Sequence, residues 1–471
     1  MKKSLLLAST ALLCVGSAFA GVDPASYETV NGHVLKNRFL SSQYLDAAEW
    51  QAFPWMATPN YARTACLANV NGEDVVIVAA SKVMEEGVVT DRAVLHIVNL
   101  ATGKLVKSFQ PTVNGETINT LLGANQVGCD DAGNVWFASY YANAYAAATE
   151  TAAAHTVDIN IYKVDDFNTG ACSLAATVML PEDEAEANGR IDYYDVVGDI
   201  TREKSNCVIM CAVSGSQKPY VYGWDFEQGS DEFVGHFDEY VSLDATETYA
   251  ADQTQWGTAP MVRIVKDEDF SGDLFYVDGF NTVPALYNRE MSMLESFASV
   301  DAELSPIPNA GTNGVGEFTI NEVPFLVYSV NQYVAPQYCG IAISELGDGM
   351  SFDGMKAYWD QVPAAGLGET SDGGARYHAV TTKVYTDSNG VEGAYLLTYK
   401  GANGLGIYTV APEEWVDPNG DNGVNDIVAD EDLNAPVEYF NLNGVKVGAD
   451  NLTPGLYITR QGSSVSKKVV K

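Results

Sequence analysis

Basic side chains are scarce in this sequence. Its 471 residues include 26 Lys and Arg against 62 Asp and Glu, and the formal net charge at pH 7 is −36. Nucleic acids and anionic membranes attract clusters of Lys and Arg, so this composition argues against both as partners. A hydrophobic content of 46% with 19% charged residues also excludes a disordered chain and predicts a globular protein.

Cysteine and histidine are also few. Seven Cys are too sparse for a disulfide scaffold, and Cys207 and Cys211 stand four residues apart in an apolar run typical of a strand. Four residues along a strand span about 13 Å, too far for a disulfide or a shared metal ion. No two of the five His lie within four residues of each other, and the sequence has no Walker, Rossmann or G-x-S-x-G motif. We therefore predict no zinc site and no organic cofactor.

The first twenty residues have the pattern of a secretory signal peptide. Two lysines precede an apolar stretch over residues 5–15, and an A-x-A site, Ala-Phe-Ala, ends at Ala20. We expect cleavage after Ala20. No later stretch approaches the about 20 apolar residues of a membrane helix, so no transmembrane segment is predicted.

Strand patterns recur in pairs along the rest of the chain. Short runs rich in Val, Ile, Tyr and Phe are separated by Gly, Asn and Asp, which is typical of many short antiparallel strands. Most pairs have a further candidate strand before and after them, which makes four strands per unit. The six pairs start 51 to 72 residues apart, over residues 75–100, 135–166, 207–226, 274–289, 325–346 and 394–411.

Four strands per unit, repeated around a ring, is the plan of a β-propeller. We predict an all-β chain with a six-bladed propeller over residues 21–416, and a seven-bladed ring is the alternative. The sixth unit lacks an outer strand, whereas residues 32–40 form a strand outside any unit. We expect that strand to complete the last blade, because closing the ring in this way removes an exposed sheet edge.

A single turn carries a sequence similar to a known propeller motif. The run from Asp131 through Gly133 to Trp136 resembles the Asp-box turn of sialidase-type propellers, but Cys129 stands where that motif has Ser or Thr. Only one copy is convincing, and the motif is structural in the family. We interpret it as a hairpin turn set by Asp and Gly.

Calcium is the one metal for which the sequence offers candidates. The linker at 417–434 is rich in Asp, Asn and Gly, and residues 417–424 look like the opening of a dockerin or EF-hand loop. Its Gly falls at position 7 of the loop, and Val428 replaces the carboxylate of position 12. Acidic clusters at 182–199 and 266–273 are further candidates. In each case the alternative is solvated loop charge.

The tail at 435–471 contains three expected strands separated by Gly and Pro turns, and it ends in a basic cluster. It resembles the C-terminal sorting domain of type IX (Por) secretion substrates. The resemblance implies a small β-sandwich-like domain, the outer-membrane secretion machinery as partner, and a secreted or surface location on a Gram-negative bacterium, reached through the periplasm. The residues that carry the resemblance are Asn441, Gly444, Pro454, Gly455, Tyr457, Lys467 and Lys468.

The end of the channel where the innermost strands begin is the expected functional face. Aromatic rings with polar neighbours at that rim can stack on sugars and bind their hydroxyls, although such residues also pack between blades. The candidate ligand-binding residues are Trp55, Tyr61, Arg63, Tyr194, Trp256, Arg376, Tyr377 and His378.

We predict a ligand-binding module for a glycan or a surface protein, because no catalytic motif is present. The alternative is a hydrolase or lyase on the same scaffold, of glycosidase or calcium-dependent phosphoesterase type. Two carboxylates about 5–10 Å apart with an Arg beside them would favour catalysis.

Overall fold

The chain was analysed as a computed structural model. It divides into two compact units, Met1–Trp415 and Val416–Lys471, and each is considered by itself. The structure describes residues 23–43, 53, 62–85, 88–118, 124–139, 145–146, 155–156, 158–178, 190–214, 220–230, 235–240, 260–279, 284–290, 292–297, 314–330, 340–368, 378–419, 438–441, 446–448, 452, 454–461 and 464–470.

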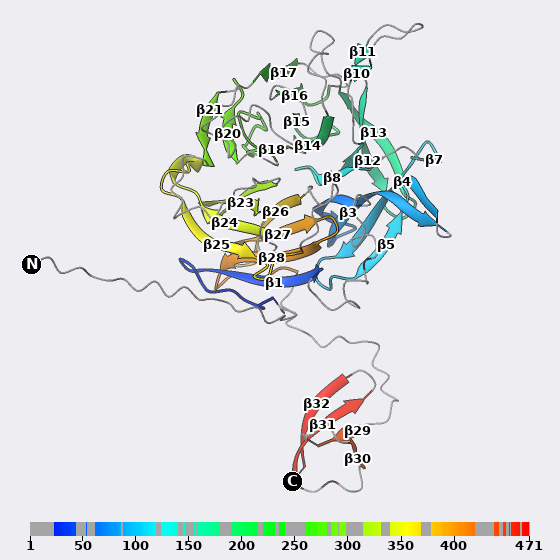
Figure 1. The fold of residues 1–471 in the computed structure, drawn as a ribbon, viewed down its shortest axis with the longest axis vertical. Coiled ribbons are helices and arrows are strands. Elements are labelled where there is room, and N and C mark those ends of the chain that lie inside the picture. Colours follow the sequence, from blue (N-terminus) through cyan, green and yellow to red (C-terminus); the bar gives the residue numbers. More distant parts are fainter. Residues whose placement is uncertain are drawn as a thin grey trace, which may run out of the picture. The chain divides into compact units, whose positions relative to one another are not determined.

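Six of the sheets described in the first unit follow one another around a ring in chain order, and each contains four antiparallel strands that form one blade (Figure 1). A hairpin of β6 (Thr112–Val113) and β7 (Glu116–Thr117) extends the second sheet. The first three blades, each from the inner strand outward, are β2 (Ala62–Val70), β3 (Glu73–Glu85), β4 (Val88–Asn99) and β5 (Leu105–Phe109); β8 (Gln126–Cys129), β9 (Val135–Ala138), β12 (Ile159–Asp166) and β13 (Ala171–Val178); β14 (Arg190–Gly198), β15 (Cys207–Ser214), β16 (Tyr220–Phe226) and β17 (Gly235–Tyr240).

The other three blades repeat this order. Two short elements accompany the blades: the ribbon of β10 (Tyr145–Ala146) with β11 (His155–Thr156), and the 3-10 turn η5 (Asp348–Met350). The blades are β18 (Met261–Ile264), β19 (Leu274–Asp278), β20 (Ala285–Asn288) and β21 (Met293–Ser296); β22 (Val315–Ile320), β23 (Val323–Val330), β24 (Gly340–Glu345) and β25 (Lys356–Val362); β26 (His378–Thr386), β27 (Glu392–Lys400), β28 (Gly404–Pro412) and β1 (His33–Ser42).

Among the described residues, six large hydrophobic clusters lie between neighbouring blades and hold the ring together. Five of them join consecutive blades, from the first and second to the fifth and sixth. The remaining cluster joins the first blade to the sixth, with Ala65 and Val78 packed in the same group as Leu397 and Ile407. This contact closes the ring at six blades. The six-bladed prediction is confirmed, and the seven-bladed alternative is wrong.

Strand β3 shows why the second strands have continuous apolar sequences. Successive side chains of a strand point to opposite faces. Val76 and Val78 therefore pack toward the sixth blade, whereas Val75 and Ile77 pack toward the second. Because both faces of the strand are covered, no polar residue alternates with the apolar ones.

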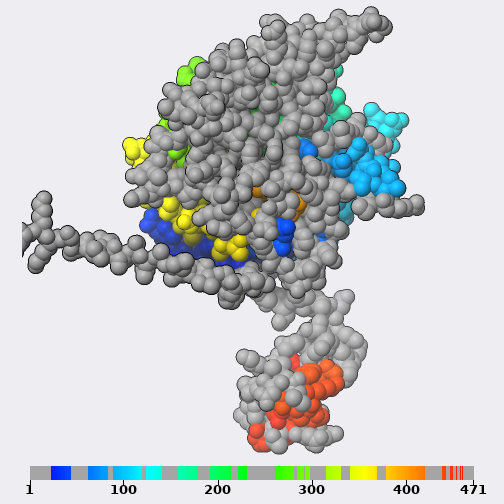
Figure 2. Space-filling model, in the orientation of Figure 1, coloured from blue at the N-terminus to red at the C-terminus, as the bar shows by residue number. Residues whose placement is uncertain are grey.

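Strand β1 comes from the N-terminal side of the chain and forms the outer edge of the sixth blade (Figure 1). It pairs antiparallel with β28 from His33 opposite Pro412 to Ser42 opposite Gly404, with a bulge between Asn37 and Phe39. In the space-filling view these dark blue residues lie on the surface beside yellow residues of the fifth blade (Figure 2). The last blade is thus built from both ends of the propeller segment.

All five described cysteines have free thiols. Cys207 and Cys211 point to the same face of β15 and pack in the cluster between the second and third blades. Burial raises the pKa of the Cys129 thiol to about 11 and that of Cys172 to about 12. These thiols therefore act as small apolar side chains in the packing.

The described residues of the second unit form one antiparallel sheet, in the order β30 (Lys446–Val447), β29 (Glu438–Phe440), β31 (Gly455–Gln461), β32 (Ser464–Val470). Four strands occur where the sequence predicted three, since the stretch expected as one strand contains both β29 and the short β30. Tyr457 and Lys468 are register partners in β31 and β32. Pro454 directly precedes β31, and Gly444 lies outside the described residues. The sandwich-like form and the sorting role stay predictions.

Candidate ligand-binding site

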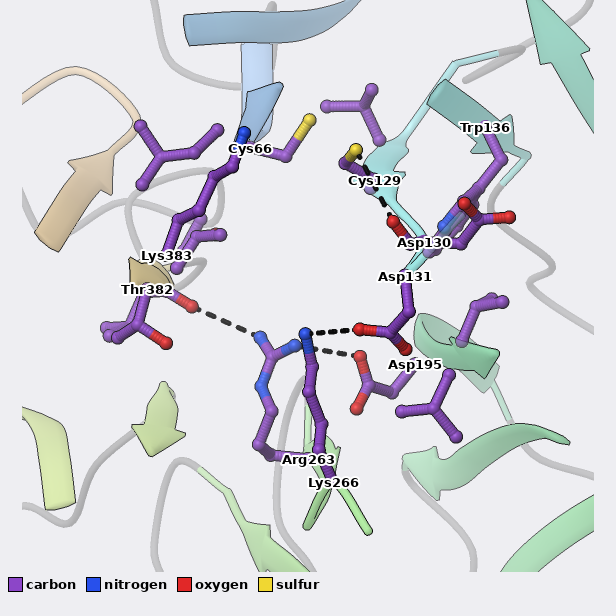
Figure 3. Close-up of a pocket in the computed structure, with 18 of the residues that line it drawn as sticks. Cys66, Cys129, Asp130, Asp131, Trp136, Asp195, Arg263, Lys266, Thr382 and Lys383 are labelled. Atoms are coloured by element: carbon purple, nitrogen blue, oxygen red, sulfur yellow. Dashed lines mark hydrogen bonds and ion pairs between the residues drawn. The ribbon is translucent and has the colours of Figure 1, made fainter. Parts of the chain in front are cut away.

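A cavity of about 610 Å³ lies at the centre of the ring. Residues of the inner strands of all six blades line it, namely β2, β8, β14, β18, β22 and β26. The turns that follow β8 and β18 also contribute, which places this part of the cavity toward the end where inner strands finish. Five charged side chains from four successive blades line this part: Asp131, Asp195, Arg263, Lys266 and Glu317. Figure 3 shows the first four of them.

Strand alternation directs Arg263 to the cavity. Its neighbours Val262 and Ile264 pack in the cluster between the third and fourth blades, so the side chain between them faces the other way. Met261, two residues earlier, lines the cavity with it. The local sequence Met-Val-Arg-Ile thus separates a core face from a cavity face.

The guanidinium of Arg263 connects four blades. Nη1 donates to Asp195 Oδ1 at 2.8 Å, Nε to the carbonyl of Val315 at 3.2 Å and Nη2 to the carbonyl of Val380 at 3.1 Å. The second oxygen of Asp195 accepts from the backbone N–H of Ile264 at 2.7 Å. These bonds hold a planar, charged donor group in a fixed orientation inside the ring.

Lys266 and Asp131 form a second ion pair closer to solvent. Lys266 Nζ lies 2.7 Å from Asp131 Oδ1, and the side chain of Lys266 is 56% exposed. Gly198 donates its backbone N–H to the other oxygen of Asp131 at 2.8 Å. Desolvation lowers the pKa of Lys266, but the charge of Asp131 outweighs it and raises that pKa overall. The ammonium group therefore stays charged.

Glu317 lies on β22 and adds a carboxyl group to the same cavity. Its Oε1 is 3.5 Å from the backbone nitrogen of Lys266, and Thr382 Oγ1 donates to its backbone carbonyl at 2.7 Å. Burial raises the pKa of Glu317, although the charges of Lys266 and Arg263 act in the opposite direction. Raised carboxyl pKa values are typical of functional sites, but they also arise from packing alone.

The turn that resembles an Asp-box holds Asp131 in place. Asp130 organises this turn: its Oδ1 accepts from the backbone N–H of Asn134 at 2.7 Å, and its Oδ2 accepts from the N–H of Ile200 at 2.8 Å. Gly133 has a φ of +89°, which favours glycine. Asp130 thus fixes the turn onto the next blade, and Asp131 is left to face the cavity.

Three of the eight sequence-predicted ligand residues are described. Arg63 donates from Nη1 to Asn125 Oδ1 at 3.1 Å. Tyr194 is buried between the second and third blades, where its backbone bonds with the side chain of Gln126 in both directions. His378 is completely buried, its Nε2 lies 2.6 Å from Thr398 Oγ1, and burial lowers its pKa.

None of these three side chains joins the charged group in the cavity. The structure does not bring them together into one site, and a ligand-binding role for them stays a prediction. The other five lie outside the described residues: Trp55, Tyr61, Trp256, Arg376 and Tyr377.

Sequence reasoning missed the charged cavity group as a site. Asp195 and Lys266 entered only as members of acidic clusters, and Arg263 did not enter at all. A usable signal was present, since two cations three residues apart on an expected inner strand are unusual in so acidic a chain.

In the acidic clusters predicted as calcium candidates, described carboxylates accept hydrogen bonds from backbone N–H groups. Asp267 accepts from the backbone N–H of Ser271 at 2.9 Å, and Asp199 accepts from that of Lys204 at 2.8 Å. Within the described ranges, no group of three or more His, Cys, Asp or Glu is placed to hold a metal ion. Residues 182–186 and 420–428 are not among them. Calcium binding therefore stays a prediction.

The fold and the cavity define a six-bladed β-propeller with a polar pocket at its centre. No protein-family model matches the sequence, and no curated protein matches it. Among the residues described, no helix is long and apolar enough to span a membrane.

Solved structures provide distant likenesses. A DUF4623 family protein from Bacteroides eggerthii matches at 13% identity and a TM-score of 0.49, over 83% of this chain and 77% of that one. A Trypanosoma rangeli sialidase matches at 9% identity and a TM-score of 0.38, over 75% of this chain and 54% of the sialidase chain. An α-L-arabinofuranosidase from Fusarium graminearum matches at 9% identity and a TM-score of 0.41, over 74% of this chain and 93% of the arabinofuranosidase chain. Likenesses this distant carry no information on ligand or reaction.

Proposed function

We propose that this protein is an exported β-propeller that binds a small polar ligand, such as a short glycan, in its central cavity. The observation that carries the proposal is the fixed polar group formed by Arg263, Lys266, Asp131 and Asp195 in a cavity of about 610 Å³. Ligand sites generally have volumes of about 300–1,000 Å³ and a few precisely placed polar groups.

Preorganisation supports binding at this place. Arg263, Asp195 and Asp131 are each tied to backbone groups of a neighbouring blade, and Lys266 is held by its ion pair with Asp131, so less side-chain entropy is lost when a ligand arrives. Apolar lining residues such as Met261 and Val380 offer surface for the C–H faces of a sugar ring. A protein ligand is the alternative occupant.

The test is calorimetric titration of the purified chain with short neutral and acidic glycans. Replacing Lys266 by Met is expected to weaken binding about 10- to 100-fold, because a hydrogen bond to a charged group contributes about 1.5–3 kcal/mol. The matched control is Lys356→Met, because Lys356 is 57% exposed and ion-paired with Glu345 but does not line the cavity. Equal losses in the two variants would argue against the cavity as the binding site.

Hydrolysis is the second candidate function, and Glu317 is the observation that favours it. A carboxyl group whose pKa is raised by burial can serve as a general acid, and Asp195 and Arg263 lie in the same cavity. Asp195 is fully engaged with Arg263 and Ile264, however, and is poorly placed to act as a nucleophile or base. Product analysis of the same titration mixtures distinguishes turnover from binding.

We further propose export in two steps, directed by residues 1–20 and then by the tail at 435–471. Deletion of 435–471 is expected to leave the propeller folded, since the tail belongs to a separate compact unit, and to retain it in the periplasm. Fractionation of the producing bacterium with immunodetection measures this. The control variant replaces Lys446, which forms an ion pair with Glu438, by Gln. Surface display of the truncated chain would contradict the proposed role of the tail.

A further inference from the structure

Two cations of the cavity, Arg263 and Lys266, have hydrogen-bonding capacity to spare. A guanidinium carries five N–H donors and an ammonium three. Arg263 uses three donors on Asp195, Val315 and Val380, and its other two have no partner among the described residues. Lys266 makes one ion pair, with Asp131. Both cations can therefore donate further bonds to an incoming acceptor.

The neighbouring aspartates are already engaged through both of their oxygens. Asp195 accepts from Arg263 and from the N–H of Ile264, and Asp131 accepts from Lys266 and from the N–H of Gly198. Neither carboxylate needs another donor. The unused donors of the cations can therefore bind an acceptor that enters the cavity.

The protonation state of Glu317 determines whether the cavity repels or binds an anionic acceptor. Its Oε1 has a single weak partner among the described residues, the nitrogen of Lys266 at 3.5 Å. An ionised Glu317 would repel an anionic ligand, whereas a protonated one would donate a hydrogen bond to it. When two carboxyl groups lie close together, the pKa of one is raised, so that one is protonated and donates a hydrogen bond to the other.

We propose that the cavity selects ligands that carry a carboxylate, such as uronic acids, and that Glu317 takes up a proton when they bind. This inference rests on the proposed ligand-binding function and names the ligand class. The ligand carboxylate accepts from Arg263, from Lys266 and from the protonated Glu317. The only covalent change is a proton transfer: the O–H bond of Glu317 forms as hydronium or the acid form of the buffer loses its proton.

The charged and titratable groups around Glu317 fix the direction of the pH dependence. Burial raises its pKa most, Lys266 and Arg263 lower it, and Asp195 raises it. Tyr276, which is fully buried on the neighbouring blade, has its own pKa raised by burial and by the charge of Glu317. A ligand carboxylate adds a further negative charge and raises the pKa of Glu317 more. Affinity therefore increases as the pH falls, until the ligand itself is protonated.

The test compares galacturonate and its dimer with galactose and its dimer on the full chain. Calorimetry between about pH 4.5 and 7.5 spans the region above the ordinary carboxyl pKa values. We expect the uronates to bind more tightly than the neutral sugars, with an affinity that rises by up to about tenfold per pH unit as the pH falls, which is the limit for one linked proton. Titration in buffers of different ionisation enthalpy should register uptake of up to one proton.

Glu317→Gln provides the sharper test, because the amide imitates the protonated carboxyl group. This variant should bind galacturonate at about pH 7.5 as tightly as the unmodified chain does at about pH 4.5, with no proton uptake. Glu345→Gln is the control, since Glu345 lies on β24 of the same blade and does not line the cavity. It should keep the original pH profile.

The outcomes separate this inference from the proposed function. Equal or tighter binding of the neutral sugars, or a pH profile unchanged in Glu317→Gln, would overturn carboxylate selection and leave the binding function standing. No binding of either sugar class by a chain that still unfolds cooperatively would overturn both.

Discussion

Loss of the Arg263 guanidinium is expected to lower the free energy of unfolding by about 3 kcal/mol, the lower end of the usual cost of removing one partner of a buried ion pair, because the Arg263 side chain is 25% exposed. Arg263→Met removes the charge but keeps much of the chain length. It leaves the carboxylate of Asp195, which is only 6% exposed, without its cation. It also leaves the carbonyls of Val315 and Val380 without this donor.

A double-mutant cycle with Asp195→Asn tests that explanation. Each single variant should be strongly destabilised in urea, and the double variant should be destabilised by less than the sum, because the charge that each single change leaves unpaired is gone. Additive losses would show that the ion pair is not the source of the effect. A loss below about 1 kcal/mol in Arg263→Met would place this pair with ordinary surface salt bridges.

The ring could be predicted because both faces of every blade are covered. That arrangement imposes long apolar runs such as 75–81 and 207–213, and the spacing between them reveals the number of blades. A strand without a unit, over residues 32–40, indicated where the ring closes, and β1 is found at His33–Ser42. What decides between six and seven blades is the cluster that joins Ala65 with Leu397, a contact between distant segments that periodicity does not encode.

The candidate site could not be predicted in the same way. Which inner-strand side chain faces the central cavity depends on the twist of each blade. Because Asp and Glu are abundant, the sequence also does not distinguish the few carboxylates that line the cavity. Asp195, for example, lines the cavity beside its partner Arg263, which lies 68 residues away in the sequence, whereas the nearby Asp192 does not line it. The predicted functional face lies at the other end of the inner strands, where they begin, and its candidate residues are selected by their aromatic rings and polar neighbours. Tyr194 shows the weakness of that criterion, since it packs between blades.

Strand β1 gives rise to the second large expected effect. A variant without residues 23–43 should lose about 5 kcal/mol or more of unfolding free energy and should self-associate. Burial of Leu35, which is fully enclosed between the fifth and sixth blades, contributes about 2–3 kcal/mol, and each pair of strand hydrogen bonds adds to it. Asp23 is removed as well, and its carboxylate accepts from the hydroxyls of Tyr27 at 2.7 Å and Tyr408 at 3.1 Å.

The deletion also exposes the edge of β28, an apolar strand whose unpaired N–H and C=O groups are a template for another chain. A synthetic peptide of residues 23–43 should therefore bind the truncated propeller, restore its melting temperature and suppress self-association, as strand addition does at other open edges. The matched control is the same peptide with Leu35→Asp, which keeps the backbone donors but places a charge in the core between the blades. Thermal unfolding and light scattering measure both effects. A truncated chain that stays monomeric with an unchanged melting temperature would show that β28 needs no partner and that the ring is closed by the contact between the first and sixth blades alone.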